Sequence, residues 1–514
     1  MANIVTSLLP RSDVAAASVD EPADESGAGS RPALVLPDDR RWSYGQLAAR
    51  AAWHRQRLEA DGVTPGDRVL VQVQKSPDAV AAYLGVLAAG AVFVPLNSGY
   101  TDVEVAVFAA DCAPRLLLCD PQRHRAIEAV AEPLGIATRP LGAASWSAPA
   151  PAADRRLEIE ERGDDDLAAI VYTSGTTGRS KGAMVSHGNL RVNAEALVAA
   201  WAIRADDVLV HALPIFHVHG LFVALHTLLM ARGQVLFLPR FEAAAVRAAL
   251  PGATLLMGVP TFYTRLLAEP GFGAEECSSM RLFVSGSAPL LASTHREFTA
   301  RTGHRILERY GMSETGMITS NPLDGERTPG TVGFALPGVE VRVVGDDGAA
   351  ALTGEVGEVE VRGANVFGGY WAMPEKNATE FRPDGFFRTG DLGSLDGDGR
   401  LTLVGRSKDL VISGGYNIHP KEIEQVLDGV EGVAESAVIG VPHDDLGEGV
   451  VAVLVAEGEA VDRVLLQAAL DESLARFKHP RRFYWLDRLP RNAMGKVQKN
   501  LLRERYRDAY RNPG

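Results

Sequence analysis

A dense loop of glycines, hydroxyls and a lysine is the part of this sequence best suited to chemistry on polyphosphates. It is the stretch Thr173-Ser174-Gly175-Thr176-Thr177-Gly178-Arg179-Ser180-Lys181-Gly182. Glycines let the backbone approach a phosphate, the hydroxyls donate hydrogen bonds, and Lys181 adds a mobile positive charge. The spacing does not match the Walker loop, so an ordinary P-loop ATPase is disfavoured. A flexible polar loop is the alternative, but the pattern favours an enzyme that uses a nucleotide triphosphate.

The elements around this loop indicate an α/β fold. The apolar run 167–172 predicts a buried strand, which places the loop at a strand's carboxyl end, where open α/β sheets bind ligands. A strand-like run at 69–73, a helical stretch at 77–89 and a second strand-like run at 92–96 form a β-α-β unit. Strand-like and helical stretches continue to alternate along the chain, which predicts mostly parallel sheets wrapped by helices. Further strands are expected at 116–119, 208–213, 235–238, 254–257, 282–285 and 306–309.

The residue pattern of the chain changes twice after these elements. Gly-rich, β-branched segments at 338–344 and 357–362 predict an antiparallel, hairpin-rich piece. Beyond residue 409 helices and strands suffice for an α+β domain of about a hundred residues. We expect three parts: a disordered leader at 1–30, a large N-terminal domain at 31–407 and a small C-terminal domain at 408–514.

Composition limits the possible partners and location. The 514 residues include 52 Lys and Arg against 65 Asp and Glu, a formal charge of −13, which disfavours nucleic acid and anionic membranes as partners. The three cysteines form no close pair, so neither a disulfide framework nor a cysteine-rich metal site is expected. No stretch approaches the roughly 20 apolar residues of a membrane span, and the acidic leader does not resemble a mitochondrial transit peptide. These features predict a cytoplasmic protein; they say nothing of its oligomeric state.

Five segments, in order along nearly the whole chain, resemble the signature motifs of acyl-CoA synthetases in the acyl-adenylate-forming superfamily. They are Thr173 to Gly182, Glu308-Arg309-Tyr310-Gly311-Met312-Ser313-Glu314-Thr315, Thr389-Gly390-Asp391, Gly405 to Asp409 with Ser413-Gly414-Gly415, and Pro490 to Lys496. The resemblance implies ATP, Mg²⁺ and CoA as cofactors or co-substrates. It also implies two half-reactions: a carboxylate attacks the ATP α-phosphorus to give acyl-AMP and pyrophosphate, and the CoA thiol then displaces AMP.

The resemblance implies roles for individual residues. Lys496 matches the catalytic lysine that reaches the acyl carboxylate and α-phosphate, where attack between two anions needs a cation. Glu314, also catalytic, and Thr173 match the residues that hold Mg²⁺. Asp391 matches the carboxylate that binds the ribose hydroxyls, with Arg406 beside it. The other expected nucleotide contacts are Ser174, Gly175, Thr176, Thr177, Gly178, Lys181, Ser287, Ala288, Glu308, Arg309, Tyr310, Gly311, Met312 and Ser313. Taken in isolation, Lys496 could be a solvated surface lysine and Asp391 an ordinary turn residue.

The resemblance further implies that the small domain is mobile. It rotates between the two half-reactions about a hinge residue, which here matches Lys408. Gly414 and Gly415 would then approach the pantetheine arm of CoA, where side chains would block the thiol. A purely structural turn would explain the same glycine pair.

Other segments are similar to malonyl-CoA synthetases in particular: Gly258 to Arg265, Val284 to Leu290 and Leu213 to Gly220. A dicarboxylate in an enclosed pocket needs a cation for its second charge, and we expect Arg265 to supply it, with Ser285 and His217 lining the acid site. A solvent-facing arginine on a helix is the alternative for Arg265. His217 and His219 lack further ligands for a metal site.

The sequence therefore predicts an AMP-forming acid-thiol ligase that joins malonate to CoA. Methylmalonate stays open as a substrate, because a methyl group changes binding by only about 1–3 kcal/mol. Alternatives are a medium-chain or aryl acyl-CoA synthetase, an adenylation enzyme that loads a carrier protein, and a catalytically inactive nucleotide-binding regulator. The presence of Lys496, Glu314 and Asp391 argues against the inactive regulator.

Overall fold

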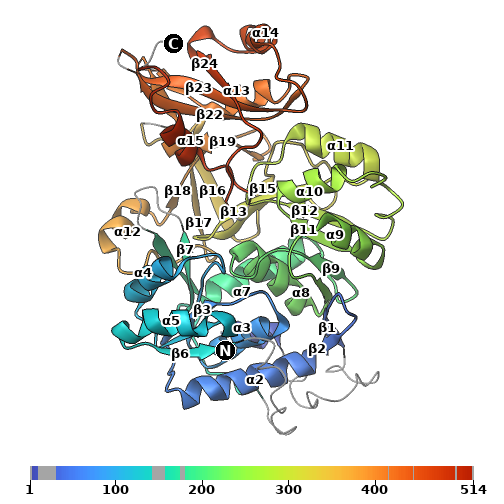
Figure 1. Ribbon diagram of the computed structural model, residues 1–514, viewed down its shortest axis with the longest axis vertical. Coiled ribbons are helices and arrows are strands. Elements are labelled where there is room, and N and C mark those ends of the chain that lie inside the picture. Colours follow the sequence, from blue (N-terminus) through green and yellow to red (C-terminus); the bar gives the residue numbers. More distant parts are fainter. Residues whose placement is uncertain are drawn as a thin grey trace.

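The structure, a computed structural model, describes residues 3–9, 31–141, 157–173, 180–345, 347–414, 416–443, 445–492 and 495–511. Two large sheets wrapped by helices form the lower part of the molecule in Figure 1, and the C-terminal domain lies at the top. The predicted α/β fold class is confirmed. No helix in these ranges combines the length and apolarity needed to cross a membrane.

The two large sheets are mostly parallel, as predicted. One has the strand order β15 (Phe334–Ala335), β14 (Gly316–Ser320), β13 (Leu307–Met312), β12 (Leu282–Ser285), β11 (Leu255–Gly258), β9 (Val208–His211), β10 (Gln234–Phe237), β1 (Pro32–Val35), β2 (Arg41–Ser43). The other has the order β6 (Ala137–Pro140), β5 (Leu116–Cys119), β3 (Arg68–Gln72), β4 (Val92–Pro95), β7 (Leu167–Thr173), β8 (Lys181–Ser186). Pairing from β9 to β13 is parallel, so the carboxyl ends of these strands meet at one edge, where the candidate site lies.

A four-stranded antiparallel sheet lies between these sheets and the C-terminal domain (Figure 1). Its order is β16 (Val339–Val344), β17 (Gly357–Gly363), β18 (Phe387–Leu395), β19 (Leu401–Arg406). The predicted hairpin-rich piece is thus confirmed. A 3-10 turn, Ser407–Asp409, follows β19, and the predicted domain boundary between residues 407 and 408 falls inside it and stays a prediction.

The C-terminal domain has its own sheet and core. Its strands are ordered β21 (Tyr416–Ile418), β20 (Val411–Ser413), β23 (Gly447–Ala456), β22 (Val433–His443), with β24 (Arg482–Trp485) paired to β23. Helices α13 (Pro420–Leu427) and α14 (Arg463–Ser473) pack their apolar residues on one core of this sheet, and α15 (Lys499–Arg505) contributes Leu502 to a second.

Helices cover the two large sheets, and local signals explain several of their ends. The helix α3, for example, begins after Ser76, whose hydroxyl accepts a hydrogen bond from Ala79 N, and has Pro77 in its first turn. The α-helices of this part, α3 included, are α2 (Tyr44–Ala60), α3 (Pro77–Ala88), α4 (Asp102–Cys112), α5 (His124–Ala131), α7 (His187–Ala200), α8 (His226–Ala231), α9 (Ala243–Ala249), α10 (Pro260–Leu267), α11 (Ala292–Thr302) and α12 (Pro374–Glu380).

The predicted disordered leader is wrong for residues 3–9. The short helix α1 (Val5–Leu8) and its flanks bury Ile4, Leu8 and Leu9 completely in the core of the large domain. Asn3 donates hydrogen bonds to Leu87 O and Glu160 O, both at 2.9 Å. Apolar burial and these backbone contacts hold the segment in place. Residues 10–30 lie outside the described part of the chain.

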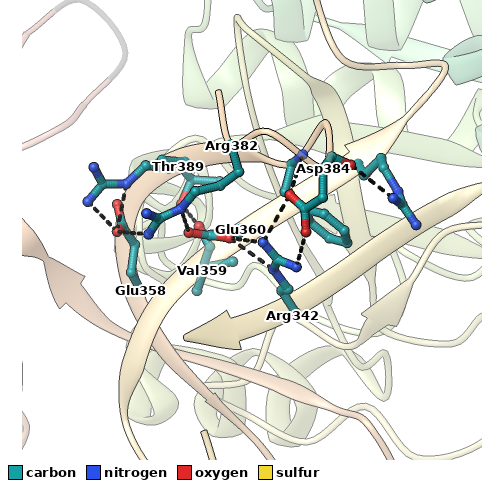
Figure 2. Close-up of polar contacts among 10 residues, drawn as sticks. Arg342, Glu358, Val359, Glu360, Arg382, Asp384 and Thr389 are labelled. Atoms are coloured by element: carbon teal, nitrogen blue, oxygen red, sulfur yellow. Dashed lines mark hydrogen bonds and ion pairs between the residues drawn. The ribbon is translucent and has the colours of Figure 1, made fainter. Parts of the chain in front are cut away.

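A network of ion pairs stiffens the four-stranded sheet. Figure 2 shows Arg342 and Arg382 pointing at Glu360, whose carboxylate is fully buried on β17. Arg342 Nη2 lies 2.7 Å from Glu360 Oε2, and Arg382 Nε lies 2.7 Å from Glu360 Oε1. Since β18 and β19 of this sheet carry Asp391 and Arg406, the network supports the backbone beneath the candidate site.

Replacing Glu360 by alanine is therefore expected to cost about 2–3 kcal/mol of unfolding free energy, because two arginines lose hydrogen bonds to a buried carboxylate, although Arg342 keeps its pair with Asp384. Urea unfolding measures the loss. Glu340→Ala on β16 is the matched control, because Glu340 pairs with Arg362 at the surface, and we expect its cost to stay within about 1 kcal/mol. Equal costs for the two variants would contradict this role for Glu360.

Candidate active site

The glycine- and hydroxyl-rich stretch from Thr173 to Gly182, here called the polyphosphate loop, joins two antiparallel strands at the edge of the six-stranded sheet. Thr173 ends β7 and Lys181 begins β8, and the two residues pair in the register of the sheet. Ser174, Gly175, Thr176, Thr177 and Gly178 lie outside the described residues, so their predicted phosphate contacts stay a prediction. Removal from water and the nearby Lys376 lower the pKa of Lys181 to about 8.

Asp391 is held rigidly between two partners. It pairs in register with Arg406 of the neighbouring strand, and Arg406 Nε lies 2.7 Å from Asp391 Oδ1. Tyr310 donates its hydroxyl hydrogen to Asp391 Oδ2 at 2.5 Å. Asp391 is buried, with 5% of its surface exposed, so its orientation is fixed before any ligand arrives. The structure thus brings together three residues that the sequence motifs placed far apart.

Glu314 lies in the turn between β13 and β14, where the charge of Lys181 acts on it. Its Oε1 accepts a hydrogen bond from the Tyr370 hydroxyl at 2.9 Å. Burial raises the pKa of Glu314, while the charges of Arg406 and Lys181 act in the opposite direction. A bound cation would relieve that burial cost, and Mg²⁺ in nucleotide sites takes only one or two protein oxygens beside phosphates and water. Glu314 and Thr173 both offer oxygen donors of the kind that Mg²⁺ prefers, and their joint role stays a prediction; no group of three or more His, Cys, Asp or Glu able to hold a metal occurs among the described residues.

Lys496 belongs to the C-terminal domain, yet its ammonium group lies in the electrostatic environment of the large domain. The charges acting on it come from Arg406, Asp391, Lys408 and Asp409. Removal from water, followed by the positive charge of Arg406, lowers the pKa of Lys496 to about 8, although part of the side chain stays exposed. The charges of the Asp391 and Arg406 pair thus act on Lys496, and its catalytic role stays a prediction.

The predicted hinge and CoA residues lie at the start of the C-terminal domain. Lys408 is exposed in the 3-10 turn after β19, a position compatible with a hinge. Gly414 has φ of +59° and donates a backbone hydrogen bond to Leu446 O at 2.9 Å. Gly415 lies outside the described residues. Their roles in rotation and CoA binding stay predictions.

A second polar group lies on the other face of β13, because successive residues of a strand point to opposite sides. Tyr310 points to Asp391, whereas the charge of Arg309 acts on His217 and His219; we call these three residues, together with Ser285 at the end of the adjacent strand, the Arg309 cluster. Arg309 is 3% exposed, and Ser285, at the end of the adjacent strand β12, is 1% exposed. A Cβ on Gly286 would lie 2.5 Å from Arg309 Cζ, so a side chain there would displace the guanidinium from this position.

The polar atoms of the Arg309 cluster lack partners within the described part of the chain. Arg309 Nε and Nη2, Ser285 Oγ and His219 Nε2 are all buried without a hydrogen bond. Burial lowers the pKa of Arg309 to about 9 and, together with the nearby Arg309, that of His217 to about 4, so both histidines are neutral near pH 7. No carboxylate in the described ranges pairs with Arg309. A buried, unpaired guanidinium is costly, which indicates a site for an anionic ligand.

The other described residues that we expect to contact the nucleotide lie close in sequence to Tyr310 or to members of the Arg309 cluster. Ser287, with φ of +68°, has its hydroxyl 3.2 Å from His219 Nδ1, and Ala288 follows it. Glu308 is buried and accepts a hydrogen bond from Gly330 N at 3.2 Å; burial raises the pKa of its carboxyl to about 8. The residues Gly311, Met312 and Ser313 continue β13 into the turn that carries Glu314.

Arg265 is not enclosed in this structure. It lies exposed on α10, with its guanidinium carbon 6.0 Å from the centroid of the Phe241 ring. The predicted enclosed setting is therefore not found for Arg265, and its contact with the acid stays a prediction. The buried cation is Arg309, which the sequence motifs had assigned to the nucleotide.

Comparison with known proteins agrees with this arrangement. The family model described as AMP-binding enzyme matches residues 22–371, and the model described as AMP-binding enzyme C-terminal domain matches residues 422–496. The chain belongs to the AMP-binding enzyme family. Its resemblance to acyl-adenylate-forming enzymes is thereby confirmed, and both domains of the fold have counterparts in that family.

The names of individual relatives in the AMP-binding enzyme family state different acids as substrates. A malonate–CoA ligase of Arabidopsis thaliana is 35% identical over 91% of this chain and 85% of the relative. An indoleacetate–CoA ligase of Aromatoleum aromaticum is 36% identical over 93% of this chain and 96% of the relative. The crystal structure of ATP-bound MatB from Rhodopseudomonas palustris is 50% identical, covers 99% of both chains and has a TM-score of 0.93.

Proposed function

We propose that this protein is an ATP-dependent malonate–CoA ligase that forms malonyl-AMP and then malonyl-CoA, releasing pyrophosphate and AMP. The observation that carries the proposal is the buried guanidinium of Arg309, whose Nε and Nη2 lack partners among the described residues. A malonate joined to the nucleotide through one carboxylate still carries a second charge. Arg309 can neutralise that charge, and Ser285 and His219 can complete the hydrogen bonds of the same carboxylate. The similarity to a malonate–CoA ligase and to MatB supports the same substrate.

In this proposal the residues of the chain divide the work of the first half-reaction. Asp391, held by Tyr310 and Arg406, accepts hydrogen bonds from the nucleotide ribose. Lys496 places a positive charge where the carboxylate approaches the α-phosphate. Glu314 and Thr173 hold Mg²⁺, which when bound neutralises phosphate charge. The second half-reaction then needs the C-terminal domain to move, with Lys408 as the hinge and Gly414 and Gly415 beside CoA. A cytosolic location stays a prediction.

A substrate panel tests the proposal. Pyrophosphate release is measured with malonate, methylmalonate, octanoate and benzoate, with CoA or a carrier protein as the thiol. We expect malonate with CoA to give the highest kcat/KM. Of the other acids, methylmalonate should have the kcat/KM nearest to that of malonate, because one methyl group changes binding by only about 1–3 kcal/mol. A preference for octanoate or benzoate would contradict the role of the Arg309 cluster, and transfer to the carrier protein alone would exclude CoA as the acceptor.

The pKa of Lys496 predicts a pH dependence of the first half-reaction. Lys496 must be protonated to screen the two anions, and its pKa in the free enzyme is about 8. The kcat/KM for malonate-dependent ATP–pyrophosphate exchange is therefore expected to be constant below pH 8 and to fall about tenfold per pH unit above it. The variant Lys496→Arg, which stays protonated, should lose this decline. A decline that persists in Lys496→Arg would assign it to another group.

A further inference from the structure

The two domains touch at a point beside the Arg309 cluster. Thr261 lies in the first turn of α10, which follows strand β11 of the large domain. Gly495, from the C-terminal domain, lies directly against it. A Cβ on Gly495 would lie 3.0 Å from Thr261 Oγ1 and 3.2 Å from Thr261 Cγ2. The backbone of Gly495 also has φ of +73°, which residues with a side chain rarely adopt. The backbone conformation therefore favours glycine here, and a side chain at position 495 would also force Thr261 to shift by a few tenths of an ångström.

Gly495 is fixed to its neighbour Lys496 by short hydrogen bonds. Gly495 N donates to Asn492 O at 2.9 Å, and Lys496 N donates to Asn492 Oδ1 at 3.0 Å. Asn492 N donates in return to Lys496 O at 2.9 Å. Arg491 adds a contact to Gly495 O and an ion pair with Glu435 of β22. A displacement of Gly495 would therefore be transmitted to Lys496.

The contact and the ammonium group of Lys496 face different parts of the site. Gly495 rests on α10, whose preceding strand pairs with the strand that ends at Ser285. The ammonium group of Lys496 faces Asp391 and Arg406. We propose that Thr261 and Gly495 form a docking contact that positions Lys496 for adenylation, and that this contact is broken when the domain rotates for thioester formation. This inference rests on the proposed function, since it assumes the two half-reactions.

The docking contact predicts that substitutions at it slow one half-reaction selectively. Gly495→Ala and Thr261→Leu should each lower ATP–pyrophosphate exchange by about 10²-fold, because a displacement of about 1 Å has effects of that size on catalysis. Formation of malonyl-CoA from supplied malonyl-AMP should stay within about twofold of wild type in both variants. Ala268→Leu, an exposed position at the C-terminal end of the same helix, is the control and should leave both half-reactions unchanged.

A double variant tests whether the two residues act on each other. Thr261→Ala removes the atoms that a Cβ at position 495 would strike, so Thr261→Ala combined with Gly495→Ala should recover about tenfold of the lost exchange activity. Such recovery demonstrates coupling between residues in contact. Thermal unfolding of each variant is measured in parallel to show that the protein is folded.

Three outcomes would overturn the docking contact: equal slowing of both half-reactions, unchanged exchange in Gly495→Ala and Thr261→Leu, or no recovery in the double variant. Failure of the proposed function has a separate signature, because wild-type protein would then exchange pyrophosphate with another acid instead of malonate. The variants can be compared with whichever acid supports exchange, so the docking contact can be tested in either case.

Discussion

Replacing Lys496 by alanine is expected to slow malonate-dependent ATP–pyrophosphate exchange by about 10²- to 10³-fold, the usual cost of removing one group that stabilises developing charge. The reason is electrostatic. Without the ammonium group, the cations left near Asp391 include Arg406 and Lys408, and Arg406 is already paired with that carboxylate at 2.7 Å. The carboxylate of the acid would then approach the α-phosphate without its closest counter-charge.

The second half-reaction separates this role from a structural one. In the conformation that the structure shows, Lys496 faces the site, whereas thioester formation needs a rotated domain. Conversion of supplied malonyl-AMP to malonyl-CoA should therefore stay within about threefold of wild type in Lys496→Ala. Lys496→Arg is the control that keeps the charge. Equal loss of both half-reactions in Lys496→Ala would show that the lysine is needed for folding or for domain assembly.

Replacing Arg309 by methionine is expected to lower kcat/KM for malonate by about 30- to 4,000-fold, which corresponds to about 2–5 kcal/mol for one partner of a buried charge pair. The KM for ATP should change by less than about threefold, because Tyr310 and Asp391 lie on the opposite face of the strand. The two parameters are read from initial rates of pyrophosphate release.

Stability gives an independent check on Arg309. In the ligand-free protein this guanidinium is buried without a partner among the described residues, so methionine should leave the melting temperature unchanged or raise it. Arg265→Ala is the matched control, since Arg265 is exposed, and we expect it to raise the malonate requirement less than Arg309→Met does. A large effect of Arg265→Ala with a small effect of Arg309→Met would restore the sequence-based assignment.

Much of the fold could be predicted because local patterns and tertiary structure agree. The runs predicted as strands at 69–73 and 282–285 are the buried strands β3 and β12, and the helix predicted at 77–89 is α3, Pro77–Ala88. The N-terminal segment could not be predicted in this way. A four-residue helix such as α1 is too short to be stable alone, and it forms because the core of the large domain buries Ile4 and Leu8.

That the residues assigned to the ribose would lie together was predictable, whereas the setting of the residues assigned to the acid was not. Asp391, Arg406 and Tyr310 lie in separate motifs, and the structure joins them by hydrogen bonds. The position of Arg309 depends on which face of β13 meets the nucleotide, which a motif does not specify. One signal was present in the sequence: if Tyr310 faces the nucleotide, strand alternation turns Arg309 to the other side. The sequence-based assignment of Arg265 to the acid rests on the resemblance of its neighbours to malonyl-CoA synthetases.

The most direct test of the account removes the second charge of the substrate and keeps its size. ATP–pyrophosphate exchange is measured with malonate and with monomethyl malonate, in wild type and in Arg309→Met. We predict that wild type prefers malonate by about 10²-fold or more and that Arg309→Met loses this preference, because the guanidinium pairs with the distal carboxylate. The same preference in both proteins would contradict the pairing of Arg309 with malonate.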